Sequence, residues 1–331
     1  MPFDLESFYN IFLNATICLK LASYAVTFCV MFYNTPSSMR VLAKFMCNLL
    51  FWDFATHVVW VGFHAFPMMP LMCFRLDGVL ASFFFYERFG HLFFLTFFTN
   101  SVNVATAIFL CFQFRLWVIR YGQSKFNSKK AQIYGYCIIV HLTVTAIIVG
   151  LYTTWPLGVD DYPEPISSEE RRNLFCFQPR AAGSQVFLFS FIGFLVGIMT
   201  GIVVLVFLSF REVNKNRNLI AEKTAKLQKV FLESLLFLSG IPINIGGIPC
   251  VIICFICYFP EVHNAQLVVV ICLLIASIYG PLMCVSTLLL FKPYRNAVKR
   301  VLKRIIFIGR MRSINTVHVS TVKGLSSRLT E

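Results

Sequence analysis

The sequence predicts an all-α membrane protein, a seven-transmembrane helix bundle with an amphipathic eighth helix. Seven apolar segments of about 20 residues or more run through its 331 residues. The chain is 58% hydrophobic and only 13% charged, whereas a soluble domain carries about 25% charged residues. Its net charge of +14 is concentrated in alternate loops, as is typical of a membrane protein with a defined orientation.

Each apolar segment can cross a hydrocarbon core of about 30 Å as a helix. A helix is required because lipid offers no hydrogen-bond partners to an open backbone. Pro242 and Pro249 should kink the sixth segment, and Gly280-Pro281 should interrupt the seventh. We expect one receptor-sized domain over residues 1–306 and a polar tail over 307–331. The predicted spans are Ile11–Tyr33, Phe45–Phe66, Leu92–Phe114, Ile133–Trp155, Gln185–Phe210, Val230–Phe259 and Leu267–Phe291.

Basic residues gather in the loops after spans one, three and five and in the chain after Phe291. The other loops and the N-terminus carry more acidic than basic residues. Short basic loops stay in the cytoplasm, so we expect an extracellular N-terminus and a cytoplasmic C-terminus. Anionic lipid accounts for the positive charge without any nucleic acid. The same basic face also suits a cytoplasmic protein partner, and the sequence leaves both open.

An amphipathic segment follows span seven after Pro293, Tyr294 and Arg295. Its apolar residues recur at offsets 0, 3, 4, 7 and 8, and basic residues fill the other face. This pattern predicts a helix that lies in the membrane interface. The apolar positions are Val298, Val301, Leu302, Ile305 and Ile306.

Span two has the densest polar content. Asp53, His57, Trp60 and His64 occur at offsets 0, 4, 7 and 11 and therefore share one helical stripe. Intramembrane ionisable groups usually face the bundle interior or a wet cavity. We expect Asp53 to join an internal polar network. Two roles are open for His57, Trp60 and His64: they line a ligand pocket, or they form hydrogen bonds and contacts with neighbouring helices.

Cys73 and Cys176 are the two cysteines in the predicted outer loops. An oxidising exterior permits a disulfide between them, while two separate thiols remain the alternative. The histidines and cysteines show no zinc-ligand spacing, and no glycine-rich phosphate loop occurs. The sequence therefore predicts no metal site and no enzyme.

Short motifs in several loops and spans resemble those of the nematode serpentine chemoreceptors of the Str superfamily, most closely its Srh or Sri branches. The resemblance covers about residues 17–305. Pro-Tyr-Arg after span seven is its most specific part. The matching motifs are Thr35-Pro36-Ser37-Ser38-Met39, Leu49 with Asp53, Phe112-Gln113-Phe114-Arg115, Ile241-Pro242 and Lys292-Pro293-Tyr294-Arg295.

The resemblance implies a chemosensory G-protein-coupled receptor of the plasma membrane or the sensory cilium. Its partners would be a small-molecule ligand, a heterotrimeric G protein and membrane lipids. Arg115 would hold the switch position, and Pro242 and Pro281 would lie at bends that move. Asp53 would occupy the place of the sodium-linked aspartate, which leaves room for Na⁺ there and implies no other cofactor.

The chain departs from the expected pattern at three places. Gln113 stands where an acidic partner of Arg115 would be, span seven reads Tyr279-Gly280-Pro281, and Gly90 replaces the usual cysteine at the start of span three. A small-molecule transporter or channel is the alternative function. The first three spans have no repeat in the last three, and no acidic ring marks an ion path, so the receptor is favoured.

Overall fold

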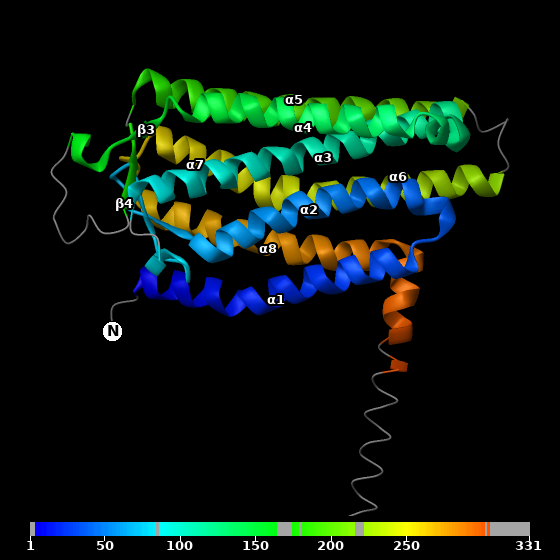
Figure 1. The fold of residues 1–331 in the computed structure, drawn as a ribbon, viewed down its shortest axis with the longest axis horizontal. Helices are drawn as coiled ribbons and strands as arrows, with labels where there is room; N and C mark the ends of the chain where they lie inside the picture. The colour runs from blue at the N-terminus through cyan, green and yellow to red at the C-terminus, as the bar shows by residue number, and fades with distance from the viewer. Residues whose placement is uncertain are drawn as a thin grey trace, which may run out of the picture.

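The computed structural model describes residues 4–83, 86–163, 174–178, 180–215, 222–301 and 303–304. In these ranges, seven helical segments are long and apolar enough to cross a membrane, and they lie side by side as one bundle (Figure 1). Five of them are the single helices α1 (Leu5–Asn34), α2 (Arg40–Phe63), α4 (Lys130–Tyr152), α5 (Ala182–Lys215) and α8 (Ala265–Leu290). The seven-span prediction is confirmed.

The third span is longer than predicted. Helix α3 covers Glu87–Ser128, and its regular part continues past Arg115 to Gly122, where φ is +81°. This left-handed conformation is open to glycine and costly for other residues, so Gly122 sets the turn. The hydropathy pattern did not indicate this continuation, because the residues between Arg115 and Gly122 include charged and aromatic side chains.

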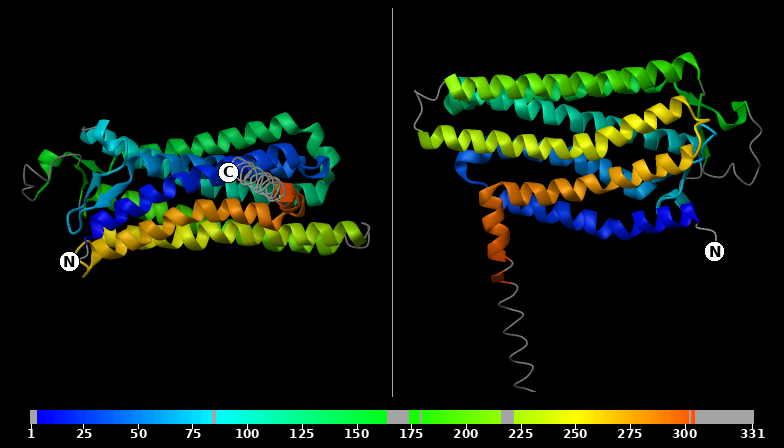
Figure 2. Two further views of the ribbon diagram at one scale, coloured as in Figure 1. Left: turned by 90° about the horizontal axis from the view of Figure 1, so that it is seen from below. Right: turned by 180° about the vertical axis from the view of Figure 1, so that it is seen from behind.

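The sixth span consists of three pieces: α6 (Glu222–Ile241), the π-helical segment η5 (Pro242–Gly247) and α7 (Ile248–Tyr258). A proline has no backbone N–H to donate, so the helix widens where Pro242 enters it. Figure 2 shows that α6 and α7 run in different directions. The kink expected at these prolines is present. In span seven, by contrast, α8 is unbroken through Pro281, because neighbouring helices support a membrane helix that lacks one hydrogen bond.

A small antiparallel sheet covers the end of the bundle at which α1 begins, and we call this end the sheet end. Its strands are β1 (Ala65–Pro67), β2 (Cys73–Leu76), β3 (Pro156–Leu157) and β4 (Leu174–Phe177), in the order β1-β2-β4-β3. Short 3₁₀ segments lie at 37–39, 81–83 and 159–161. The opposite end, at which α1 ends and α6 begins, is the basic end.

A further helical segment begins at Lys292 after α8, passes the end of α1 and points away from the bundle at a steep angle (Figures 1 and 2). Tyr294 is buried, and its hydroxyl lies 3.0 Å from the Thr35 hydroxyl at the end of α1. Lys299 and Val301 are exposed. The predicted apolar positions Leu302, Ile305 and Ile306, and the tail from 307 on, lie outside the described residues.

Candidate functional site

A cavity of about 480 Å³ lies within the bundle toward the sheet end. Its wall is built from α2, α3, α5, η5, α7 and α8, together with one residue of β2 and Trp155. Ligand pockets in proteins usually measure about 300–1,000 Å³ and combine an apolar wall with a few polar groups. None of the described residues that line this cavity is Asp, Glu, Lys or Arg. The polar residues of the wall are Thr56, His57, Ser101, Thr200, Ser277 and Tyr279.

Two of the three pocket residues expected in span two line the cavity. The Trp60 ring is packed with Phe97, with ring centroids 4.9 Å apart, and is 5% exposed. The His57 ring lies 4.9 Å from the Tyr279 ring of α8. Together with Thr56, these two side chains form the α2 side of the cavity.

His64 is not among the residues that line this cavity. Helix α2 ends at Phe63, so the backbone of His64 is no longer helical and the expected stripe stops before it. Its Nε2 instead lies 3.0 Å from Asn10 Oδ1 of α1. His64 therefore connects α1 to the sheet end.

Asp53 is fully buried where α1, α2 and α8 meet. The Tyr24 hydroxyl donates a hydrogen bond of 2.8 Å to its Oδ2, and His57 Nε2 lies 3.7 Å from its Oδ1. Gly280 makes this closeness possible, because a Cβ at that position would lie 2.3 Å from the His57 ring and 2.4 Å from the Tyr24 hydroxyl. Asp53 thus joins α1 to α2 through polar side chains, and Gly280 lets α8 pack closely against them.

These neighbours fit a hydrogen-bonded carboxyl group better than a sodium ion. Hard cations take several oxygen ligands, whereas Asp53 is contacted by a donating hydroxyl and by an imidazole. No cluster of three or more His, Cys, Asp and Glu side chains able to hold a metal occurs among the described residues.

Two polar features of the interior were missed from the sequence. Lys20 of α1 is 2% exposed, and its Nζ has no hydrogen-bond partner among the described residues. The sequence did contain an indication of this buried group, because Lys20 is a lysine inside an apolar span and lies four residues before Tyr24, on the same helical face. The second feature joins α2, α3 and α4: His141 Nδ1 lies 2.6 Å from Asn103 Oδ1, and its Nε2 lies 3.1 Å from Asn48 Nδ2.

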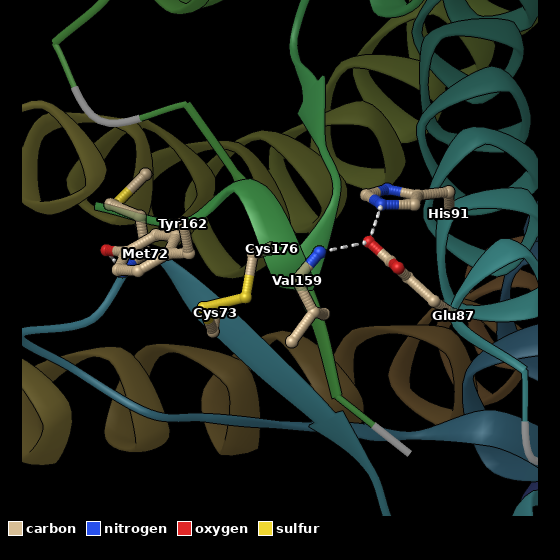
Figure 3. The surroundings of a disulfide bond; sticks show 7 residues. All are labelled: Met72, Cys73, Glu87, His91, Val159, Tyr162 and Cys176. Carbon is tan, nitrogen blue, oxygen red and sulfur yellow. Dashed lines mark hydrogen bonds and ion pairs between the residues drawn. A yellow bond between two sulfur atoms is a disulfide. The ribbon is translucent and has the colours of Figure 1, made fainter. Parts of the chain in front are cut away.

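A disulfide joins Cys73 of β2 to Cys176 of β4 (Figure 3). The two residues face each other in the antiparallel register. Position 90 of α3 is a glycine and takes no part in the disulfide. Because Gly90 has no side chain, β4 can pack closely against α3; a Cβ at this position would lie 2.3 Å from the Phe175 ring.

Glu87, at the start of α3, contacts the same region (Figure 3). Its Oε1 accepts a 3.0 Å hydrogen bond from the Val159 backbone N–H and lies 3.4 Å from His91 Nε2.

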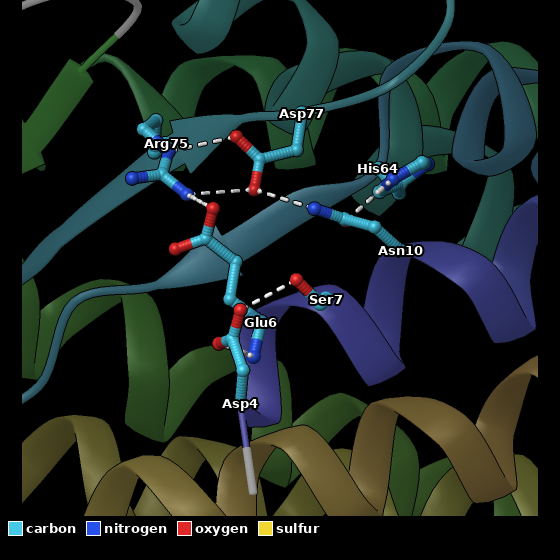
Figure 4. A network of polar contacts seen from close by, with 7 residues as sticks. All are labelled: Asp4, Glu6, Ser7, Asn10, His64, Arg75 and Asp77. Carbon is cyan, nitrogen blue, oxygen red and sulfur yellow. Dashed lines mark hydrogen bonds and ion pairs between the residues drawn. The ribbon is translucent and has the colours of Figure 1, made fainter. Parts of the chain in front are cut away.

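The same sheet is tied to the start of α1 by charged groups (Figure 4). Arg75 of β2 forms two hydrogen bonds with Asp77, of 2.7 and 3.0 Å, and an ion pair with Glu6. These contacts, led by the Asp77 hydrogen bonds, raise the pKa of Arg75 above its ordinary value. Asn10 donates a hydrogen bond to Asp77 and also contacts His64, so it joins the two residues. Burial lowers the pKa of His64.

At the basic end, Arg115 of α3 contacts α6. Its Cζ lies 4.7 Å from the centroid of the Phe231 ring, and its Nη2 donates a 3.4 Å bond to the Gln228 carbonyl. Gln113, which replaces the expected acidic residue, instead bonds the Tyr136 hydroxyl of α4 at 3.2 Å. The guanidinium therefore links spans three and six, and no acidic side chain among the described residues pairs with it.

Of the predicted bend residues, Pro242 begins η5 and lines the cavity, whereas Pro281 lies inside α8 beside Gly280. Pro293 and Arg295 flank the buried Tyr294 at the start of the segment that follows α8, and Arg295 Nη1 lies 3.5 Å from the Leu289 carbonyl.

A comparison with protein families matches residues 4–304 to the family described as serpentine type 7TM GPCR chemoreceptor Srh. The match covers all seven spans and the described part of the segment that follows α8. No curated protein matches the chain in a sequence comparison.

Proposed function

The chain belongs to the Srh family of serpentine seven-transmembrane chemoreceptors, and from this premise we propose that it binds a small extracellular ligand and activates a heterotrimeric G protein. The proposal has three parts: a ligand site, a moving element and a surface for the G protein. Each rests on a different region of the described structure.

The ligand site is the cavity near the sheet end. Its volume of about 480 Å³ suits a small molecule. His57, Ser277 and Tyr279 supply polar groups from α2 and α8, and aromatic rings such as Trp60 supply most of the remaining contacts. A ligand in this cavity contacts several spans at once, so it can favour one arrangement of the bundle over another.

The moving element is the sixth span. Its π-helical segment, which begins at Pro242, lines the cavity, and its other end contacts Arg115 through Phe231 and Gln228. This single observation carries the proposal, because one span connects the ligand site to the basic end. Ligand binding shifts α6 away from Arg115 and opens a surface between spans three and six.

The G protein binds at the basic end, which we place in the cytoplasm. The basic loops of this end support that orientation by the positive-inside rule, and the Cys73–Cys176 disulfide supports an oxidising environment at the sheet end. The segment that follows α8 rests on anionic lipid at the inner surface of the plasma membrane of a sensory cell.

Expression in a heterologous cell with a second-messenger reporter tests the function. A screen of small volatile and water-soluble compounds should find at least one that evokes a saturable response, and Arg115→Ala should reduce that response at equal surface expression. The competing transporter function predicts ligand flux or current in vesicles that contain the receptor and no G protein. Flux there, without any G-protein response in cells, would contradict the proposal.

A further inference from the structure

The cavity is separated from the sheet end by packed aromatic rings. Phe74 of β2 and Trp155 belong to its wall and are 3% and 1% exposed. The Trp155 ring lies 4.1 Å from the Phe177 ring and 4.6 Å from the Phe187 ring. The disulfide fixes the strands that carry Phe74 and Phe177. Among the described residues, tightly packed apolar side chains at the sheet end therefore separate the cavity from the extracellular solvent.

The wall that faces α2 and α3 is also closed. Trp60, Phe98 and Ile108 line the cavity, and each is at most 7% exposed. A further layer of helix covers them, since α2 and α3 pack along their length and α4 packs on α3.

The wall formed by α5 and α7 is different. Val196 of α5 and Ile248 of α7 line the cavity, yet they are 58% and 52% exposed on the surface of the bundle. Val251 and Ile252 of α7, which also line it, are 37% and 38% exposed, and Thr200 of α5 is exposed as well. We call these five residues the side opening. They lie within two membrane-spanning segments, Ala182–Lys215 and Gln228–Tyr258, so the surface around them faces lipid.

Local sequence explains why the two helices leave this space. Gly246 and Gly247 of η5 line the cavity beside the side opening and bring no side chain to fill it. The nearest atom to a Cβ at Gly247 would be the Pro242 carbonyl oxygen, at 3.7 Å. The π-helical turn also directs α7 along a different line from α6, as Figure 2 shows.

We propose that the receptor takes an uncharged lipophilic ligand, which enters the cavity from the bilayer through the side opening between α5 and α7. This inference rests on the proposed ligand site. The chemical class follows from the wall, whose described residues include no acidic or basic side chain apart from His57. A charged molecule would lose its hydration there without a partner charge, whereas an apolar molecule is concentrated by the bilayer at the level of the opening.

The test uses the full-length receptor in phosphatidylcholine vesicles and an apolar carbene precursor, trifluoromethyl-iodophenyl-diazirine, which partitions into lipid. After brief illumination, mass spectrometry locates the labelled residues. We expect label on Phe98 and Phe191, which line the cavity and are 7% and 2% exposed. Label on the lipid-facing Phe207, which is 66% exposed, provides the internal reference.

The decisive variants place an indole at the opening. Val196→Trp and Ile248→Trp, alone and together, should lower label on Phe98 and Phe191 about fivefold relative to Phe207, because a tryptophan covers 150–250 Å². Val203→Trp is the matched control. Val203 lies two turns further along α5, is 63% exposed and is not among the cavity residues, so cavity label should be unchanged.

Two results would overturn the inference: cavity label that persists when both sides of the opening carry tryptophan, and an absence of cavity label in the unaltered receptor. The single variants answer the question if the double variant does not fold, as judged by size-exclusion chromatography. The assay needs neither the natural ligand nor a G protein. Entry through lipid and G-protein coupling can therefore fail independently of each other.

Discussion

Phe231→Ala should raise the ligand-independent signalling of the receptor. The Phe231 ring lies under the Arg115 guanidinium, with 4.7 Å between Cζ and the ring centroid. Both residues belong to the contact between α3 and α6 that the proposed activation breaks. A cation–π contact of this kind contributes about 0.5–2 kcal/mol. Alanine removes that contribution from the closed state and leaves the open state unchanged.

The magnitude follows from the two-state equilibrium. A loss of about 1.4 kcal/mol changes the closed-to-open ratio tenfold. A receptor that is about 1% open without ligand would then be about 9% open. The Phe231 ring also packs with Phe291 at 5.3 Å between centroids, so some stabilisation of the fold is lost as well. Basal second-messenger output should rise about five- to tenfold at equal surface expression.

Two controls separate this effect from a general disturbance of α6. Phe231→Tyr retains an aromatic ring under the guanidinium and should leave basal output close to its normal level. Phe237→Ala removes a ring that is 62% exposed on the same helix and should change nothing. Unchanged basal output in Phe231→Ala would refute the role of the Arg115 contact in holding the bundle closed.

Three further predictions concern other parts of the molecule. Asp53→Asn should change basal output several-fold with little loss of surface expression, because it alters the buried hydrogen bond from Tyr24 by about 1 kcal/mol. Retention of the variant inside the cell would favour a purely structural role. Gly90→Ala should lower the free energy of unfolding by about 1–3 kcal/mol, because its Cβ would clash with the Phe175 ring. Gly135→Ala is the control and should leave stability unchanged, because no atom lies within 4 Å of a Cβ there. Equal melting temperatures for the two variants would contradict this packing. Burial lowers the pKa of His64, so the unfolded chain takes up a proton more readily than the folded one and stability should fall as the pH drops below about 6.5. His64→Gln should weaken the dependence of the melting temperature on pH between pH 7 and 5. An unchanged pH dependence in this variant would show that other groups control it.

The seven spans were predictable because crossing a membrane imposes a strong condition on local sequence. A helix that spans lipid must be apolar for about 20 residues, and this requirement appears in the sequence whatever the helices pack against. The kink of the sixth span was predictable for a similar reason, since Pro242 lacks a backbone donor wherever it lies. The unbroken α8 shows the limit of such local reasoning, because the neighbours of Pro281 decide whether the helix continues.

The candidate site was predicted in part. A helical period places Asp53, His57 and Trp60 on one face of α2, and the structure brings them to the interior. His64 obeys the same period only if the helix reaches it, and α2 ends one residue earlier. The partners of these residues come from other spans. No sequence signal pairs Tyr24 with Asp53 or Tyr279 with His57.

The sequence by itself determined the number of spans, the approximate limits of most of them and the asymmetry of charge between the two ends. These properties are local or compositional, and the membrane selects them one segment at a time. Only the tertiary structure decided that a cavity exists, that aromatic packing closes its sheet end and that its side wall between α5 and α7 is exposed. Such features depend on how side chains from helices distant in sequence fill space between them, and hydropathy and periodicity describe each helix alone.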